Sequence, residues 1–151
     1  QARFQLLGAL APENRAAIDP QLVQSWHAEG VIEYLGQAPD VRPYIAAASC
    51  VVLPSYREGA PRTLIEAASM GRPIIATDVP GCRSVIEDGV TGYLCTVRSG
   101  ESLAQACLKF LGLCDEARAA MGKEGRRKME REFDQAIVIG AYRRRLAGRP
   151  C

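Results

Sequence analysis

Glu58 and Glu66, two acidic residues separated by seven others, are the side chains whose types and spacing best suit chemistry. Glu58 follows an apolar run that ends near residue 54, and Glu66 interrupts the otherwise apolar stretch 64–68. A carboxylate has two acceptor oxygens, which match the two hydroxyls of a vicinal diol such as a ribose. The spacing alone leaves a second interpretation open, in which Glu58 is a solvated loop acid and Glu66 a helix-face acid paired with a lysine or arginine.

The residues between the two glutamates predict the start of a helix that could bind an anion. Gly59 leaves room for a ligand to approach the backbone, and Pro61 suits a first helical position because its missing N–H would be unpaired anyway. The free amides and the dipole of such a helix end favour a diphosphate without a metal ion. Arg62 is close enough to the helix start to donate to a phosphate, although a solvated arginine is the alternative.

The elements that must position these residues alternate between short apolar runs and helices. Strands are predicted at 3–8, 31–35, 50–54, 73–77 and 93–97, and helices at 19–30, 40–48 and 61–70, followed by three C-terminal helices at about 103–111, 115–133 and 136–146. This alternation is typical of βαβ units with buried parallel strands. We therefore expect an α/β fold, a Rossmann-like doubly wound parallel sheet with C-terminal helices. In the first of those helices the inward face is predicted to carry Leu103, Ala104, Cys107, Leu108 and Leu111.

Composition limits the classes of function. A chain of 151 residues has the size of one domain, and its net charge of +2 gives no footprint for nucleic acid. The six cysteines form no C-x-x-C pair and are interpreted as buried thiols in a reducing compartment, while a single histidine argues against a metal site. No apolar run approaches the ~18 residues of a membrane span and no signal peptide opens the chain, so we expect a cytoplasmic protein.

The segment 54–67 resembles the E-x7-E signature of the group 1 (family 4) retaining glycosyltransferases, which have the two-domain GT-B fold. The likeness continues in order and spacing through Gly71-Arg72-Pro73-Ile74-Ile75-Ala76-Thr77-Asp78, Pro80-Gly81-Cys82 and Asp88-Gly89-Val90-Thr91-Gly92. It covers nearly the whole chain. The form Glu-Gly-x-Pro-Arg is most similar to the branch that builds bacterial surface polysaccharides and lipid-linked glycans, commonly from UDP-N-acetylhexosamines.

This resemblance implies a role for each matching residue. Glu66 would hold the nucleotide ribose and Glu58 would lie by the transferred sugar as the catalytic residue. The backbone amides at Gly59, Ala60 and the following turn would meet the diphosphate, and the strand that ends at Gly36 would contact the base. The full set of expected nucleotide-sugar-binding residues is Gly36, Gly59, Ala60, Pro61, Arg62 and Glu66. No cofactor and no metal are expected, since the nucleotide-sugar is a substrate.

The resemblance also implies that residues 1–151 are the C-terminal, donor-binding domain of a longer enzyme. The N-terminal acceptor domain, the first strand of this domain and the loop that supplies basic phosphate ligands would precede Gln1. The fragment alone is then expected to bind nucleotide-sugars weakly or not at all, to be inactive and to self-associate, because Ile139, Tyr142 and Leu146 and the open edge of the sheet lack part of their partner surface. His27 is expected to be a surface histidine rather than the family's histidine near the reaction centre.

The expected partners are a nucleotide-sugar donor and a glycan or lipid-linked acceptor. Contact with the inner face of an anionic membrane is a further hypothesis, carried by Arg126, Arg127, Lys128 and Arg131 and by Arg143, Arg144 and Arg145. The alternative is that Glu124, Glu130 and Glu132 balance these charges on solvated helix faces.

Two other functions remain open on the same architecture. A nucleotide-sugar 2-epimerase shares the fold but needs no acceptor, and a non-catalytic module would bind a nucleotide without transferring a sugar. A dinucleotide oxidoreductase is a poor third, because no G-x-G-x-x-G follows any predicted strand.

Overall fold

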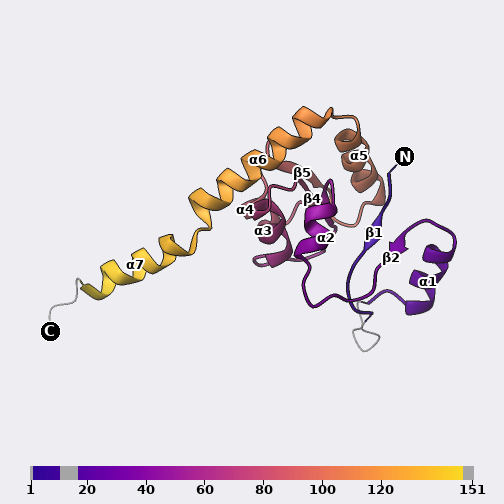
Figure 1. Ribbon diagram of the computed structural model, residues 1–151, viewed down its shortest axis with the longest axis horizontal. Coiled ribbons are helices and arrows are strands. Elements are labelled where there is room, and N and C mark those ends of the chain that lie inside the picture. The colour runs from indigo at the N-terminus through magenta and orange to yellow at the C-terminus, as the bar shows by residue number, and fades with distance from the viewer. Residues whose placement is uncertain (1, 11–16, 148–151) are drawn as a thin grey trace. The chain divides into compact units, whose positions relative to one another are not determined.

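A computed structural model describes residues 2–10 and 17–147 of the chain (Figure 1). The chain divides into two compact units, Gln1–Val41 and Arg42–Cys151, and each is described by itself. Both units combine helices with parallel strands, which confirms the α/β fold class predicted from the sequence. Within the described residues the strands pair as a two-stranded sheet in the first unit and a three-stranded sheet in the second.

The first unit is one short βαβ arrangement. Its elements are β1 (Gln5–Leu6), α1 (Pro20–Ala28) and β2 (Glu33–Tyr34), and its two strands pair in parallel. The Asp19 carboxylate caps α1 by accepting a hydrogen bond from the Gln21 amide at 2.9 Å. Gly30 follows α1 with φ at 73°, a left-handed conformation that glycine adopts at little cost. The predicted start and stop of this helix are therefore confirmed.

The second unit holds the segment with the two glutamates. Its elements are α2 (Arg42–Ala47), β3 (Val51–Leu53), α3 (Arg62–Ser69), β4 (Ile74–Thr77), α4 (Pro80–Val85), β5 (Gly92–Cys95), α5 (Gly100–Leu111), α6 (Asp115–Glu132) and α7 (Gln135–Ala147). The strands lie in the order β3, β4, β5, all parallel, with Val51 opposite Ile74 and Thr77 opposite Cys95. Every residue of β4 is buried, as expected for a central parallel strand.

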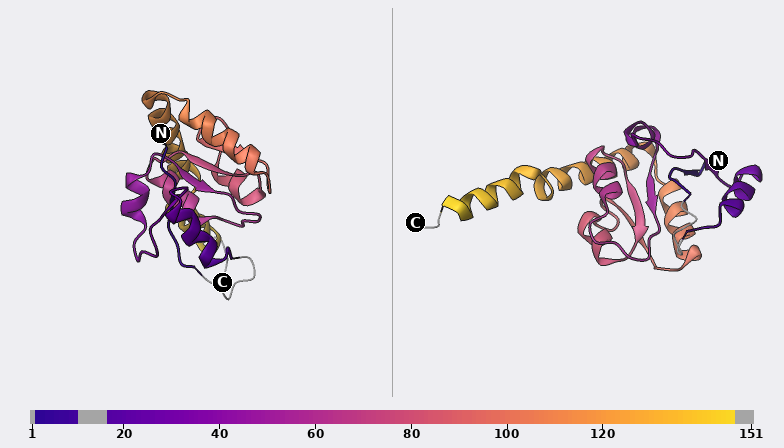
Figure 2. Two further views of the ribbon diagram at one scale, coloured as in Figure 1. Left: turned by 90° about the vertical axis from the view of Figure 1, so that its right-hand side faces the viewer. Right: turned by 90° about the horizontal axis from the view of Figure 1, so that it is seen from below.

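Helices cover both faces of this sheet, with α3 on one side and α5 on the other (Figures 1 and 2). On the α5 side, Ile75 and Tyr93 pack with Ala106, Phe110 and Met121 in one buried cluster. On the α3 side, Leu64, Ala67 and Ala68 are buried. The core thus holds the start of α3 firmly relative to the strands.

Helix α6 packs against the end of α3 through two buried glycines, Gly122 and Gly125. A Cβ atom on Gly122 would collide with the carbonyl oxygen of Gly71 and would lie 2.9 Å from its carbonyl carbon. A Cβ atom on Gly125 would meet the Ala68 side chain at 3.8 Å. The backbones of α6 and of the turn after α3 therefore touch without a layer of side chains between them.

The structure corrects three predictions about these elements. Helix α4 was not predicted at all. Pro61 is the N-cap of α3 rather than its first helical residue, with φ at −71° and ψ at 102°. The inward face of α5 is formed by Leu103, Ala106, Cys107 and Phe110, whereas Leu108 is 68% exposed. The prediction was right for Leu103 and Cys107 but wrong for Ala104, Leu108 and Leu111, because apolar residues surround this helix and its own pattern does not decide which face meets the sheet.

Candidate functional site at the carboxyl edge of the sheet

The segments that follow β3, β4 and β5 leave the sheet at one edge, because the three strands are parallel. Residues 54–61 follow β3, residues 78–79 follow β4 and residues 96–99 follow β5. In open α/β sheets this carboxyl edge is where ligands bind. The structure thus places Glu58, Gly59, Ala60 and Pro61 where a ligand site is expected.

The loop that contains Glu58 is anchored to the end of β4. The Thr77 hydroxyl, which is buried, donates a hydrogen bond to the carbonyl oxygen of Ser55. Gly81, in the first turn of α4, is also buried and lies against the Glu58–Gly59 backbone. Glu58 itself is half-buried, and Gly59 and Ala60 are exposed. The loop therefore presents one acid and two exposed backbone positions on a fixed base.

The start of α3 offers backbone donors for an anion. No side chain caps this helix at Pro61, and the first amides of any helix have no partner within the helix itself. Partial positive charge gathers at such an end and favours a phosphate. Arg62 adds a guanidinium whose side chain is 90% exposed and free to move toward a ligand.

Glu66 lies on the second turn of α3, and its side chain is 40% exposed. Its Oε1 atom is 3.8 Å from Nη2 of Arg62, four residues earlier on the helix. Exposed pairs of this kind contribute little to stability, about 0.3–0.5 kcal/mol. Glu66 is therefore paired with an arginine, as the simpler interpretation proposed, yet the pair is loose enough for a ligand to separate it.

Two further pairs at this edge were missed from the sequence. The Arg98 guanidinium lies over the Tyr56 ring, 5.2 Å from its centroid. Arg98 has φ at 60°, which is unusual for a residue other than glycine. Arg83 Nε donates to Asp78 Oδ1 at 2.5 Å, and this hydrogen bond raises the pKa of Arg83. Tyr56 and Asp78 each follow a strand, and that position was the signal that could have found them.

The pKa of the buried Cys82 thiol responds to the charge of Glu58. The Cys82 side chain is buried, and burial is the main reason why the pKa of its thiol is raised. The negative charge of Glu58 raises this pKa further, while a hydrogen bond with Thr77 lowers it. The pKa of the buried Cys82 thiol thus responds both to the Glu58 charge in the loop and to Thr77 at the end of β4.

Gly36, the residue expected near the base, belongs to the first unit. It follows β2 with φ at 73°, and its carbonyl oxygen accepts a hydrogen bond from the Gly8 amide at 2.8 Å. The Tyr34 hydroxyl donates to the Gly8 carbonyl oxygen at 2.9 Å. His27 is exposed, as predicted, and its Nδ1 atom accepts from the Tyr34 amide at 3.1 Å. Since Gly36 is described only within its own unit, its expected role in base binding stays a prediction.

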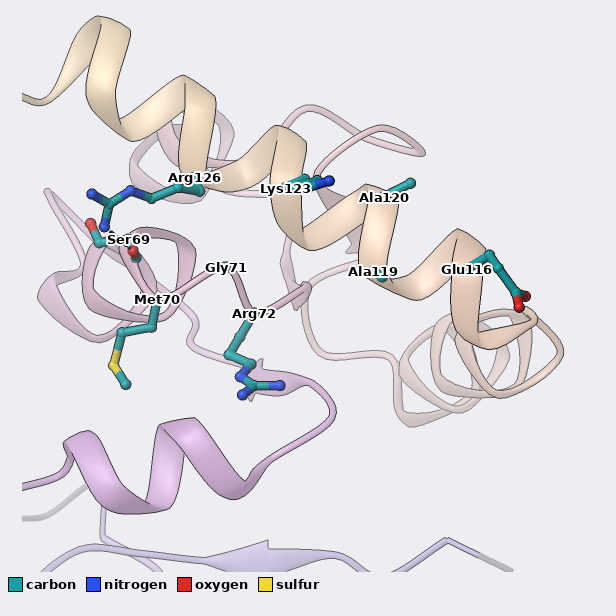
Figure 3. Close-up of a pocket in the computed structure, with 9 residues that line it drawn as sticks. All are labelled: Ser69, Met70, Gly71, Arg72, Glu116, Ala119, Ala120, Lys123 and Arg126. Atoms are coloured by element: carbon teal, nitrogen blue, oxygen red, sulfur yellow. Dashed lines mark hydrogen bonds between the residues drawn. The ribbon is translucent and has the colours of Figure 1, made fainter.

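A pocket of about 710 Å³ lies at the opposite end of α3, beside α6 (Figure 3). Arg72, Lys123 and Arg126 line it but point in different directions (Figure 3). Arg72 donates to the Ala46 carbonyl oxygen at 2.5 Å, and Arg126 donates to the Ser69 carbonyl oxygen. These cations do not converge on one point, so the pocket offers no comparable site for an anion.

The basic residues of α6 are largely paired with acids on the same helix. Arg126 pairs with Glu130, Arg127 with Glu124, and Lys128 and Arg131 with Glu132. These are the acids named in the alternative to the membrane hypothesis. Within the part of the chain that the structure describes, no ion pair involves Arg143, Arg144 or Arg145 on α7.

No group of three or more His, Cys, Asp or Glu side chains in residues 2–10 and 17–147 is arranged to hold a metal ion. None of the helices within these residues combines the length and apolar character that a membrane span requires.

Comparison with known proteins identifies the family. The model of a family described as glycosyl transferases group 1 matches residues 1–112, which include the whole loop and α3. The chain belongs to this glycosyltransferase family. Among curated members, it is 31% identical over 122 residues to N-acetyl-alpha-D-glucosaminyl L-malate synthase of Bacillus anthracis, covering 81% of this chain and 32% of that protein.

A second glycosyltransferase relative comes from Campylobacter jejuni. It is N,N'-diacetylbacillosaminyl-diphospho-undecaprenol alpha-1,3-N-acetylgalactosaminyltransferase, 29% identical over 142 residues that cover 94% of this chain and 36% of that protein. The chain spans about a third of the length of these two curated relatives.

Solved structures of two enzymes share the fold. Anabaena HepE in complex with UDP and glucose has a TM-score of 0.82 at 21% identity, covering 97% of this chain and 41% of that one. Sucrose-phosphate synthase of Thermosynechococcus elongatus has a TM-score of 0.75 at 29% identity, covering 94% and 38%. The match with HepE bears on the fold alone, because its sequence identity is low.

Proposed function

We propose that this chain is the donor-binding part of a retaining glycosyltransferase that moves a sugar from a UDP-sugar to a glycan or lipid-linked acceptor during bacterial surface polysaccharide synthesis. The observation that carries the proposal is the position of the Glu58–Gly59 loop and the uncapped start of α3 at the carboxyl edge of the sheet. Family membership supports transfer as the reaction class. The name of the Campylobacter jejuni relative, which includes a diphospho-undecaprenol-linked sugar, supports a lipid-linked acceptor.

In this proposal the nucleotide is held mainly by α3. Glu66 accepts hydrogen bonds from the ribose hydroxyls, which displace its weakly bound partner Arg62. Arg62 then turns toward the diphosphate, where the amides of Gly59 and Ala60 and the helix dipole also stabilise negative charge. The base contact at Gly36 stays a prediction from the resemblance. The donor needs no metal ion, because backbone amides and a guanidinium take over charge neutralisation.

Glu58 is proposed to act on the transferred sugar. Its carboxylate accepts hydrogen bonds from sugar hydroxyls as the bond to the diphosphate breaks and positive charge develops on the sugar ring. Such interactions are worth more in the transition state than in the ground state, so they raise the rate rather than the affinity. The leaving diphosphate gains charge at the same time, and the start of α3 is placed to stabilise it.

Family membership favours transfer over the 2-epimerase alternative. The remaining alternative, a module that binds a nucleotide without transferring a sugar, is separated by product analysis. We propose that the protein that contains this chain works in the cytoplasm, at the inner face of the membrane where a lipid-linked acceptor is available. The 151-residue segment alone is proposed to be inactive and to self-associate through the exposed Ile139, Tyr142 and Leu146.

The deciding experiment is titration of the full-length protein with UDP, with and without EDTA, together with a Glu66→Ala variant. The control is Glu130→Ala, which also removes the acid of an i, i+4 pair with an arginine, 2.7 Å apart, but on α6. We expect Glu66→Ala to weaken UDP binding by roughly 1–3 kcal/mol, and EDTA and Glu130→Ala to leave it unchanged. Normal UDP affinity in Glu66→Ala, or loss of affinity in EDTA, would refute the assignment.

A further inference from the structure

Gly81 lies closer to the Glu58–Gly59 backbone than any residue with a side chain could. A Cβ atom built on Gly81 would lie 2.5 Å from the Gly59 carbonyl oxygen, 2.7 Å from the Glu58 carbonyl carbon and still nearer to the Glu58 carbonyl oxygen. All three atoms belong to the backbone, so no side chain can rotate away to make room. The first turn of α4 and the loop are thus in direct main-chain contact.

The first turn of α4 is itself fixed to the sheet. The Asp78 amide donates to the Cys95 carbonyl oxygen at 2.8 Å, which ties the start of this segment to β5. The Val79 amide donates to the Thr77 carbonyl oxygen at 2.9 Å, and the Ser84 hydroxyl donates to the Gly81 carbonyl oxygen at 2.7 Å. These hydrogen bonds restrict movement of the first turn of α4, and therefore of Gly81, away from the loop.

Thr77 makes the second link between the same two segments. Its hydroxyl donates to the carbonyl oxygen of Ser55, 22 residues earlier in the chain. Ser55 and Gly59 lie on either side of the exposed turn of the loop. The Thr77 hydrogen bond holds the beginning of the loop next to β4. The Gly81 contact limits how closely the Glu58–Gly59 backbone can approach α4.

We propose that Gly81, together with Thr77, is a positioning residue that sets where the Glu58–Gly59 peptide stands relative to the donor diphosphate. This inference rests on the proposed function, in which the Gly59 and Ala60 amides meet that diphosphate. A methyl group at position 81 needs the loop backbone to move by about 1 Å to reach ordinary contact distance. A misplacement of about 1 Å near a reaction centre can cost on the order of 100-fold in rate.

The test compares UMP with UDP as probes, using calorimetry on the full-length protein. The ratio of their dissociation constants reports how well the second phosphate is bound. In Gly81→Ala we expect UMP affinity within about twofold of wild type and UDP affinity at least tenfold weaker. The matched control is Gly122→Ala, whose Cβ atom collides with the Gly71 carbonyl group at the other end of α3. It should lower the melting temperature but leave the UMP-to-UDP ratio unchanged.

A second pair of variants covers the case in which Gly81→Ala fails to fold. Thr77→Val keeps the volume of the side chain but loses the hydrogen bond to Ser55, and Thr77→Ser keeps the bond. We expect the ratio to fall in the valine variant and to be preserved in the serine variant. A folded Gly81→Ala or Thr77→Val protein with the wild-type ratio overturns the positioning role alone. A wild-type protein that binds neither UMP nor UDP overturns the proposed function, and this inference with it.

Discussion

Nη2 of Arg62 lies 3.8 Å from Oε1 of Glu66, one turn further along α3. The two side chains proposed to hold different parts of the nucleotide therefore hold each other in the free protein. At this distance and exposure the attraction is weak, so a diphosphate can draw Arg62 away and leave both Glu66 oxygens open to the ribose. In the absence of a ligand, Arg62 partly neutralises the negative charge of Glu66.

The first prediction concerns Arg62. We expect Arg62→Ala to weaken UDP binding by roughly 1.5–3 kcal/mol, the usual contribution of a hydrogen bond to a charged group, and to leave uridine binding nearly unchanged. Arg62→Lys should recover part of the loss, since an ammonium keeps the charge but not the forked geometry. Calorimetry with uridine and UDP measures both. Equal weakening of the two ligands would mean that Arg62 does not contact phosphate.

The second prediction concerns Glu58. Glu58→Gln keeps the size of the side chain but removes its charge, so it should lower kcat more than it raises the donor KM. Initial rates of the full-length enzyme over a range of donor concentrations separate the two constants. Glu66→Gln is the matched comparison, and it should act mainly on KM. A Glu58→Gln enzyme with normal kcat and a raised KM would show that Glu58 only binds the donor.

The third prediction concerns the cysteines, whose exposure differs from the uniform burial expected. Cys114 is exposed, whereas burial raises the pKa of Cys50 to about 12 and also raises the pKa of Cys82. A raised pKa means less thiolate at a given pH, and the thiolate is the reactive form. We expect iodoacetamide at pH 8 to modify Cys114 first and to reach Cys50 and Cys82 only after unfolding. Cys151 lies outside the described residues.

Peptide mapping by mass spectrometry, with and without denaturant, follows each thiol. Rapid modification of Cys82 in the folded protein would show that the segment beneath Glu58 opens readily. The shift at Cys50 also fixes the sign of a stability effect. The unfolded thiol ionises near pH 9 and the folded one only near pH 12, so the free energy of unfolding should fall as pH rises between these values.

The fourth prediction concerns membrane contact. Because the basic residues of α6 are paired with acids, we assign this contact to the arginines of α7. Replacing Arg143, Arg144 and Arg145 by alanine should weaken the binding of the full-length protein to anionic vesicles by about 1 kcal/mol per charge. Vesicle flotation measures this loss as a smaller bound fraction. The control replaces Arg127, Lys128 and Arg131, three cations that are paired with acids on α6, and should have a smaller effect. Equal binding of the wild type to neutral and anionic vesicles would remove the hypothesis.

The sequence predicted most of the fold because the strands and α3 have clear patterns. The apolar residues of β4 and the change of period after Pro61 were enough to place these elements. Helix α4 was missed because it has six residues, too few to show a period, and begins with Pro80-Gly81, which is also typical of a turn. The inward face of α5 depends on contacts with Tyr93 and Met121, which lie on other elements.

The same division holds for the candidate site. Glu58 and Glu66 stood out because an acid near apolar residues breaks the local pattern. The contacts of Thr77 with Ser55, and of Gly81 with the Glu58–Gly59 peptide, join residues about 22 positions apart. Only the pairing of β3 with β4 brings these segments together, so no local feature of the sequence could reveal them.

The glycine contact between α6 and the turn after α3 has a mechanical consequence. Helices normally meet through interdigitated side chains, which can absorb a displacement by changing rotamer. No side chains lie between Gly122 and Gly71 to change rotamer in this way, because the two backbones touch. A displacement of α6 is therefore transmitted to the turn at the C-terminal end of α3 with no side-chain rearrangement between the two backbones. Bending of the second unit is therefore expected at positions other than this contact between α6 and the turn after α3.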